Sequence, residues 1–251
     1  MKKIRKLLVS KKEQICPNLL RITLTGQDLI DFPEQEKGGY VKLMFPNLSS
    51  NDQSYLHRPY TIRNFCKTNL ELVIDFANHK GNKGLATHWA QNTNLGDNIL
   101  ISGPGPKQNI PKNTDWFLFV GDMSALPAIS AYLEDLDQHT EGRAVIEVLE
   151  EKDKISLKKP QNFEIYWIIN SSGFPKDSKL FEKVSSVEFL QGNPYIWVAC
   201  EFNNMKKIRN YFQNQKKIDR NFMYVSSYWK AGLDQEAHKM MKKADAINWK
   251  G

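Results

Sequence analysis

The chain has 251 residues, of which 41% are hydrophobic and 25% charged, and its formal net charge is +7. These values are ordinary for a globular protein of one or two domains, and no apolar run is long enough to span a membrane. Cys16, Cys66 and Cys200 lie far apart and form no CxxC or Cys/His cluster, which argues against a zinc site or a disulfide framework. We therefore expect no metal site and, because no apolar leader follows the basic start, a cytoplasmic location.

The positive charge is concentrated in the first half of the chain. Sixteen Lys and Arg stand against nine Asp and Glu through Lys112, and the remainder is balanced. Six of these cations lie within the first 12 residues, where a solvated, frayed start is the simplest interpretation. The alternative is a field that attracts anionic small molecules. No helix-turn-helix, zinc-finger or RNP signature accompanies the charge, so we expect no nucleic-acid partner.

The first 110 residues are typical of an antiparallel barrel or sandwich, because short strands alternate with turn residues. Strands are expected at residues 20–25, 40–45, 60–63, 70–76 and 98–102, with one helix at residues 85–91. The run Gly103-Pro104-Gly105-Pro106 then reads as a turn or linker.

A different pattern begins at Trp116. Residues 116–120 are continuously apolar, as expected of a strand buried on both faces. Further strands are expected at residues 144–149, 165–169, 195–199 and 221–226, with helices at residues 125–136, 205–212 and 235–244. Alternating strands and helices predict a parallel sheet. We thus expect an antiparallel β-barrel domain, residues 1–112, followed by a Rossmann-like α/β domain, residues 113–251, with a C-terminal helix.

The segment from His57 to Arg63 carries the sharpest chemical signal. The Arg58 guanidinium can bind a pyrophosphate in bidentate geometry, the Tyr60 ring can pack on a flat aromatic cofactor, and the Thr61 hydroxyl can contact a polar edge of it. On a strand, Arg58 and Tyr60 point to one face and Thr61 to the other, so one cofactor requires a local bend at Pro59. A strand with ordinary cross-strand pairs is the alternative.

Three other positions lie where ligands are expected to bind. Residues 84–87 begin a helix, whose free N–H groups can bind phosphate, although a plain helix start is the alternative. Asp122 follows a buried strand at the carboxyl end, where ligands dock on open α/β sheets; simple helix capping is the alternative. Glu150 and Glu151 follow the strand 144–149, and carboxylates there disfavour a ligand with an extra phosphate.

Taken in order, these segments resemble the siderophore-interacting proteins, the FAD-binding ferric-siderophore reductases of the ferredoxin-reductase superfamily. Residues 57–63 are similar to the Arg-x-Tyr-Thr/Ser flavin signature, and residues 20–26, 75–90, 121–129 and 227–232 are similar to further family motifs. The resemblance covers roughly residues 20–235. Leu85 replaces the family's usual proline, and Met123-Ser124 replaces Glu-Thr.

The resemblance implies an N-terminal domain that holds FAD non-covalently and a second domain that binds NADH or NADPH. The implied cofactor contacts are Arg58, Tyr60, Thr61, Asp75, Phe76, His79, Gly84, Ala86, Thr87, Asp122 and Trp229, with Arg63 and Lys230 as substrate contacts. It also implies hydride transfer to the flavin and then electron transfer to Fe(III) in a siderophore, which releases Fe(II). Because the flavin carries the chemistry, no catalytic side chain is expected.

Some of these expectations leave alternatives open. Lys152 and Lys154 oppose the effect of Glu150 and Glu151, so the lean toward NADH is slight. A flavin or ferredoxin reductase, or a siderophore-binding protein without catalytic activity, would share much of the pattern. We expect a monomer whose partner is a ferric siderophore.

Overall fold

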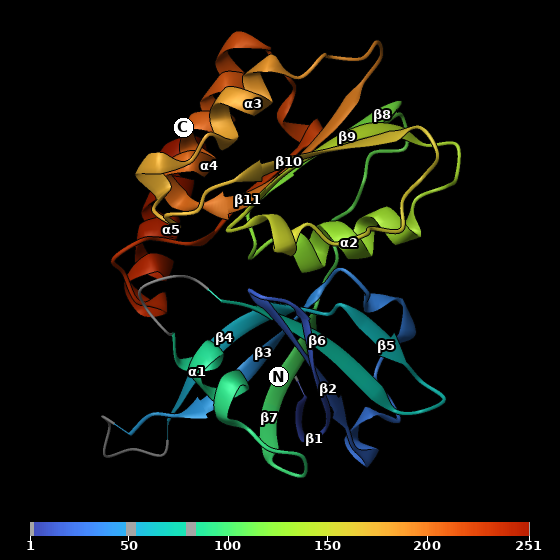
Figure 1. Cartoon of the computed structure of the whole chain (residues 1–251), viewed down its shortest axis with the longest axis vertical. Coiled ribbons are helices and arrows are strands. Elements are labelled where there is room, and N and C mark those ends of the chain that lie inside the picture. Colours follow the sequence, from blue (N-terminus) through green and yellow to red (C-terminus); the bar gives the residue numbers. More distant parts are fainter. Residues whose placement is uncertain (1–2, 49–53, 79–83, 251) are drawn as a thin grey trace. The chain divides into compact units, whose positions relative to one another are not determined.

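The computed structural model describes residues 3–48, 54–78 and 84–250 (Figure 1). The chain forms two compact units. The first comprises Met1–Asn109, Pro127–Asp135 and Ile155–Lys158, and the second comprises Ile110–Leu126, Leu136–Lys154 and Lys159–Gly251. The expected domain boundary between residues 112 and 113 stays a prediction. Within the described part of the chain, no helix combines the length and the apolar character needed to span a bilayer.

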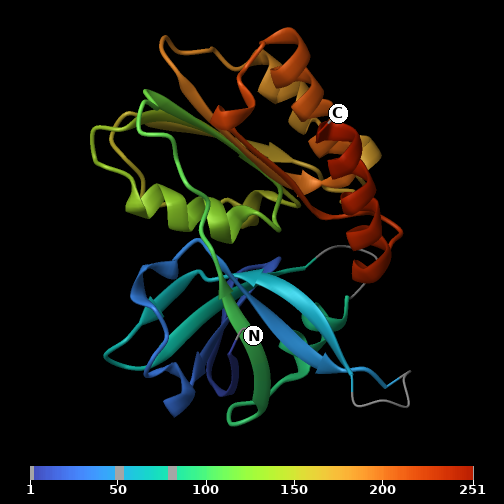
Figure 2. The ribbon, with the colours of Figure 1, turned by 180° about the vertical axis from the view of Figure 1, so that it is seen from behind.

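The first unit is built on a curled sheet of seven antiparallel strands, whose hydrogen-bonded order is β4-β3-β7-β1-β2-β6-β5 (Figures 1 and 2). The strands are β1 (Ile4–Cys16), β2 (Leu19–Thr25), β3 (Tyr40–Pro46), β4 (Tyr55–Thr61), β5 (Asn64–Cys66), β6 (Glu71–Ala77) and β7 (Asn98–Gly105). The unit also holds 3-10 turns at Gln27–Leu29 and Glu34–Glu36, helix α1 (Leu85–Asn92) and most of helix α2 (Leu126–Asp135). The predicted antiparallel architecture is confirmed.

The expectation of a frayed start is wrong, because residues 4–16 form β1, which pairs with β2 and β7. Its first half alternates: Leu7 and Val9 are buried, and the intervening side chains are exposed. Arg5 is also buried, and its guanidinium donates to the carbonyl oxygens of Gly103 at 2.7 Å and Asp28 at 2.9 Å. The clustered cations hid this alternation, because one of them points into the protein.

The expected turn after residue 102 begins later than predicted. Strand β7 continues through Gly105, and Tyr40 of β3 lies opposite Gly105 in the ladder. A Cβ atom at Gly105 would lie 2.1 Å from the Tyr40 ring, so a glycine is needed for this close approach. The Gly-Pro-Gly pattern therefore marks close packing at the end of a strand.

The second unit is built on five strands that are parallel, as predicted, and their order in the sheet is β10-β9-β8-β11-β12. The strands are β8 (Trp116–Gly121), β9 (Glu141–Val148), β10 (Phe163–Ile169), β11 (Pro194–Glu201) and β12 (Met223–Trp229). Helices α3 (Leu180–Ser186), α4 (Phe202–Asn210) and α5 (Gln235–Lys250) accompany them, with a π-helical turn at Tyr211–Gln215 and 3-10 turns at Glu151–Asp153, Pro175–Asp177 and Arg220–Phe222. Helix α3 was not predicted, because seven residues are too few for a clear helical period.

Gly142 lies where two neighbouring strands leave no room for a side chain. A Cβ atom there would lie 2.3 Å from the Phe163 ring and 2.6 Å from the Phe117 carbonyl oxygen. We expect Gly142→Ala to lower the free energy of unfolding by about 1–3 kcal/mol through overpacking, as measured by urea denaturation. Gly84→Ala is the control, because a Cβ atom at Gly84 meets nothing within 4 Å. Equal stability of Gly142→Ala and the wild type would contradict this packing.

Helix α5 docks on β12 through a buried histidine. His238 Nε2 lies 2.8 Å from Ser227 Oγ, and burial, together with the charge of Lys242, lowers the pKa of His238 to about 4. In the unfolded chain, a histidine has a pKa of about 6.5, so the unfolded chain takes up the proton before the folded one as the pH falls. The titration of His238 alone should therefore lower the free energy of unfolding by about 3 kcal/mol as the pH falls from about 6.5 to 4.

The variant His238→Gln isolates this contribution, because glutamine can still bond to Ser227 and does not titrate. Urea unfolding at a series of pH values should show a smaller loss of stability in the variant than in the wild type. Parallel curves for the two proteins would show that His238 does not titrate as its burial requires.

Candidate functional site

Strand β4 carries three of the predicted cofactor contacts. It pairs with β3, where Arg58 lies opposite Leu43, Tyr60 opposite Val41 and Thr61 opposite Tyr40. The pairing continues through residue 59 without a register shift, so the expected bend does not interrupt the ladder. The Arg58 Nη1 atom donates to the His57 carbonyl oxygen at 3.1 Å. Each of the three side chains is half-buried at one edge of the sheet.

The Tyr60 side chain brings β4, β6 and α1 together. Its ring lies 4.5 Å from the Phe76 ring, centroid to centroid, and the Thr87 side chain lies close enough to its hydroxyl to affect its pKa. Loss of water around the phenol raises the pKa of Tyr60 to about 12, against smaller opposing effects of Thr87 and Arg58. The phenol is therefore neutral at physiological pH, and it can pack as a ring and share a hydrogen bond.

Helix α1 presents its N-terminal end without a side-chain cap from any described residue. Gly84 precedes the helix, and Ala86 and Thr87 of the first turn are buried. At the opposite end, the Lys12 ammonium donates to the carbonyl oxygens of Gln91 at 2.7 Å and Thr93 at 3.2 Å. The helix is thus anchored by its C-terminal end, while free N–H groups and the positive end of the dipole remain for an anion. His79, also predicted as a contact, lies outside the described residues.

These features fit a flavin dinucleotide. Arg58 supplies a guanidinium for a phosphate, Tyr60 an aromatic ring, and α1 an uncapped N-terminus. Among the described residues other than Gly84 and its chain neighbours, no atom lies within 4 Å of a Cβ built on Gly84, so this part of the chain leaves the helix start open. A hollow of about 50 Å³ also lies between β6 and α1, lined by Phe76 and Thr87 among others.

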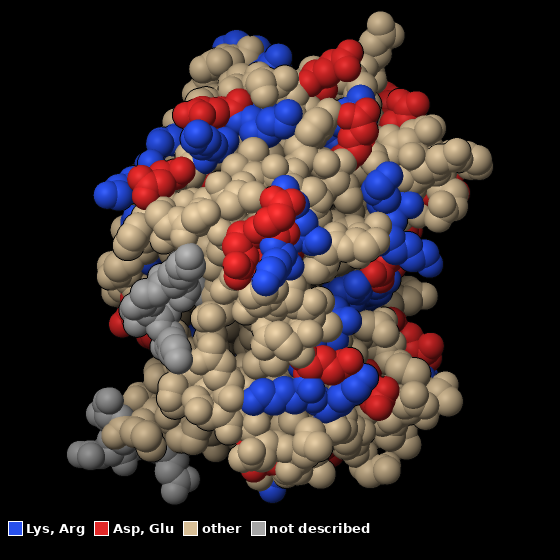
Figure 3. Space-filling view, in the orientation of Figure 1, with Lys and Arg blue, Asp and Glu red and all other residues tan. Residues whose placement is uncertain are grey.

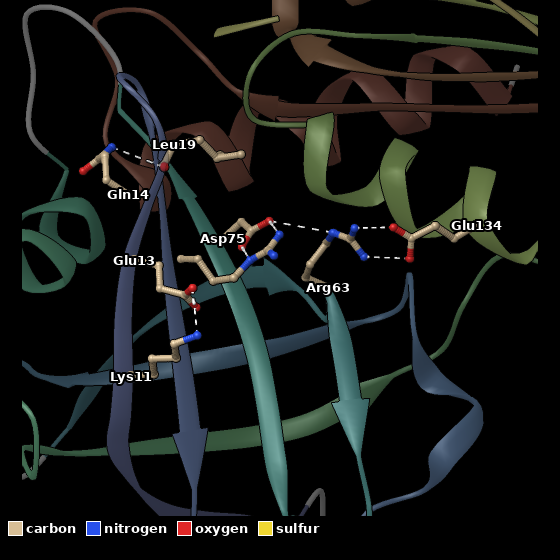
Figure 4. A network of polar contacts seen from close by, with 8 residues as sticks. Lys11, Glu13, Gln14, Leu19, Arg63, Asp75 and Glu134 are labelled. Atoms are coloured by element: carbon tan, nitrogen blue, oxygen red, sulfur yellow. Dashed lines mark hydrogen bonds and ion pairs between the residues drawn. The ribbon is translucent and has the colours of Figure 1, made fainter. Parts of the chain in front are cut away.

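Asp75 is kept apart from this group. Adjacent residues of a strand point to opposite faces, so Phe76 reaches Tyr60 while Asp75 lies on the other side of β6 (Figure 4). There the buried carboxylate accepts two hydrogen bonds from Arg21, at 2.6 and 2.8 Å, and lies 3.8 Å from Arg63 Nε. The geometry gives Asp75 an ion pair, and its cofactor role stays a prediction.

Arg63 is held in the same network. It donates two hydrogen bonds to Glu134 of α2 (Figure 4). Glu134 also pairs with Lys37 at 2.8 Å. Although burial opposes it, these cations hold the pKa of Glu134 below its ordinary value. Arg63 lines a groove of about 470 Å³, but carboxylates of the same groove balance its charge. Its role as a substrate contact is not tested by this arrangement.

In the second unit, four polar or aromatic side chains meet at the carboxyl ends of β8, β11 and β12. Trp229 Nε1 donates to Asp122 Oδ2 at 2.8 Å, which brings these two predicted contacts together. The Lys230 ammonium, predicted to contact substrate, donates to Glu201 Oε1 at 3.0 Å. Asp122 and Glu201 are both buried. This is the edge at which parallel sheets bind ligands.

Sequence reasoning missed Glu201. It is the last residue of the buried strand β11, and an acidic residue at the carboxyl end of an apolar run was the available signal. Near the end of β9, Glu150 accepts the N–H of residue 153 in a capping box, and Glu151 pairs with Lys154 at 2.7 Å. These contacts weaken the sequence argument for NADH. In the described ranges, no group of three or more His, Cys, Asp and Glu side chains could hold a metal ion.

Comparison with known proteins places these observations in a family. The model of the siderophore-interacting FAD-binding domain matches residues 8–55 and 48–108, and the siderophore-interacting protein model matches residues 114–232. The ferric vibriobactin reductase of Vibrio cholerae is 32% identical over 248 residues, which cover 91% of this chain and 90% of that protein.

Two further relatives agree. The NADPH-dependent ferric-chelate reductase of Escherichia coli is 24% identical, with 91% of this chain and 94% of that protein covered. The crystal structure of the siderophore-interacting protein SipS from Aeromonas hydrophila superposes with a TM-score of 0.87 at 30% identity, over 98% of this chain and 99% of that one. The predicted family, fold and flavin cofactor are thereby confirmed. The chain belongs to the siderophore-interacting protein family, and its first half is that family's FAD-binding domain.

Proposed function

We propose that this protein is a ferric-siderophore reductase that uses FAD and NADH or NADPH. The observation that carries the proposal is the group formed by Arg58, Tyr60, Thr87 and the uncapped start of α1, within a domain of an FAD-binding family. The reductase names of the Vibrio cholerae and Escherichia coli relatives support the same reaction.

The residues of the first unit bind and orient the cofactor. Arg58 holds the pyrophosphate, with the N–H groups of residues 84–87 as further donors. Tyr60 supports the ring system, and its own ring packs against Phe76. Thr61 contacts the polar edge of the flavin. Bound FAD would supply the redox chemistry, namely hydride acceptance and one-electron transfer to ferric iron.

The second unit provides the nucleotide site at the carboxyl edge of its parallel sheet. Trp229 offers an aromatic surface there, held by Asp122. Lys230 and Arg63 are the candidate substrate contacts, and each is paired with a carboxylate. A ligand that takes either cation must therefore compete with Glu201 or Glu134.

The substrate is an iron complex with a small chelator. Fe(II) binds an oxygen-rich chelator less tightly than Fe(III), so reduction releases the metal. The positive charge of the first half favours an anionic complex, although basic and acidic side chains lie next to one another on the face drawn in Figure 3. We place the reaction in the cytoplasm, where reduced nicotinamide nucleotides are available, and attribute it to a monomer, because one chain contains both units.

Turnover with different acceptors tests the proposal. FAD-loaded protein is supplied with NADH or NADPH and with a ferric siderophore, a ferredoxin or free flavin, and Fe(II) is trapped by a coloured chelator. We expect turnover with the ferric siderophore to exceed turnover with the other acceptors. Preferential reduction of ferredoxin or free flavin would replace the proposal by a general flavoprotein reductase.

A further inference from the structure

The segment from Ser227 to Ala231 is held at the carboxyl edge of the second sheet by two buried acids. Asp122 directly follows β8 and Glu201 is the last residue of β11, and they are 7% and 1% exposed. Every hydrogen bond that the structure records for these two carboxylates comes from within the second unit. The two acids therefore have a role that binding of a ligand alone does not explain.

The two carboxylate oxygens of Asp122 accept hydrogen bonds from different parts of the second unit. Oδ1 accepts from the Ser124 backbone and hydroxyl, which fixes the turn that follows β8. Oδ2 accepts from Trp229 Nε1 at 2.8 Å and from the Glu201 backbone N–H at 2.9 Å. The indole is thereby tied to the ends of two strands by one buried atom.

Glu201 completes the support. Its Oε2 accepts from the backbone N–H groups of Asn203 and Asn204 and caps α4, while Oε1 accepts from Lys230 Nζ at 3.0 Å and Ala231 N at 3.4 Å. The carboxylate thus neutralises Lys230 and fixes the backbone that follows Trp229.

The ladder between β11 and β12 explains why Trp229 is within reach. Cys200 pairs with Ser227, but Glu201 pairs with Trp229, so one extra residue of β12 lies at Tyr228. A bulge of this kind re-aims the side chains that follow it, and bulges are common beside binding sites. Here it places Trp229 next to Glu201 and within hydrogen-bond distance of Asp122.

We propose that Asp122 and Glu201 are positioning residues, which act on nucleotide binding through Trp229 and the backbone that follows it. Asp122 sets the orientation of the indole, and Glu201 holds the lysine and the backbone. The inference rests on the proposed function, because it assumes that this edge receives the nicotinamide nucleotide. It also has a part that can be measured without any ligand.

The ligand-free measurement is acrylamide quenching of Trp229 fluorescence, obtained as the difference between each protein and its Trp229→Phe counterpart. We expect Asp122→Asn to make Trp229 more accessible to the quencher, and Glu201→Gln to do so to a smaller extent, because glutamine can still cap α4. The matched control is Glu147→Gln. Glu147 is a buried acid of the same sheet that bonds with Ser178 and Asn170, and its substitution should leave Trp229 unchanged.

The second measurement is titration of the FAD-loaded protein with NAD⁺, which binds without reducing the flavin. We expect Asp122→Asn to weaken binding by about tenfold, the effect of losing a hydrogen bond to a charged group. In the Trp229→Phe background the same substitution should have little further effect, because a residue that acts through the indole has nothing left to position.

Unchanged quenching of Trp229 in both acid variants would overturn the proposal. It would also be overturned if the effects of Asp122→Asn and Trp229→Phe on NAD⁺ binding multiplied as independent contributions. If the wild type fails to bind NAD⁺, the nucleotide part of the proposed function fails, and the quenching measurement alone then decides whether the acids hold Trp229.

Discussion

Arg58→Ala should weaken FAD binding by about 1.5–3 kcal/mol, roughly 10- to 150-fold in Kd. The guanidinium lies on the same strand as Tyr60, close enough to affect the pKa of its phenol, and its loss removes charge-assisted hydrogen bonds to the pyrophosphate. Titration of the apoprotein with FAD, followed by flavin fluorescence, measures the change. The FAD affinity of Arg58→Lys should lie between those of the wild type and Arg58→Ala, because lysine keeps the charge and loses the bidentate geometry.

Arg220→Ala is the matched control for this experiment. Arg220 is exposed in the second unit, over the ring of Trp249. Its removal changes the net charge equally and leaves Arg58, Tyr60 and α1 intact. FAD affinity should be unchanged in this variant. If both arginine variants lose affinity alike, the effect is one of overall charge, and if neither does, the pyrophosphate lies elsewhere.

Asp75→Ala should lower the free energy of unfolding by about 3–5 kcal/mol, the range for removing one partner of a buried ion pair. The carboxylate side chain is 2% exposed, and its loss leaves Arg21 without its partner and Arg63 with Glu134 alone. Urea denaturation of the apoprotein measures this effect. A direct cofactor contact would instead reduce FAD affinity while the apoprotein kept its stability.

Glu13→Ala is the control for the loss of a carboxylate on the same face. Glu13 pairs with Lys11 across side chains that are 36% and 63% exposed, so its removal should cost less than about 1 kcal/mol. If Asp75→Ala were as mild as Glu13→Ala, the Arg21–Asp75 pair would not be an important support of the first unit.

Much of the architecture could be predicted from hydrophobic patterns. Residues 116–120 read as a fully buried strand and form β8, and the alternation at residues 20–25 matches β2. Clustered charge defeated the same reasoning at β1, because Arg5 occupies a buried position where the pattern requires an apolar residue. Helix α3 and strand β5 were not predicted, because each is too short to show a hydrophobic period.

The candidate site was predicted in part, for a physical reason. Sequence order places Asp75 beside Phe76, but the period of a strand sends them to opposite faces, so one motif contributes to two different environments. The bond between Trp229 and Asp122 joins residues 107 positions apart. No local sequence pattern predicts such a pair. The role of Glu201 becomes evident only when the ends of β8, β11 and β12 are considered together.

The most direct measurement of the central claim is an anaerobic spectrum of the FAD-loaded protein. On addition of NADH or NADPH, the absorbance of oxidised flavin should disappear, and it should return when a ferric siderophore is added, with Fe(II) formed in proportion. A protein that binds no FAD, or whose flavin spectrum is unchanged by both nucleotides, would contradict the account.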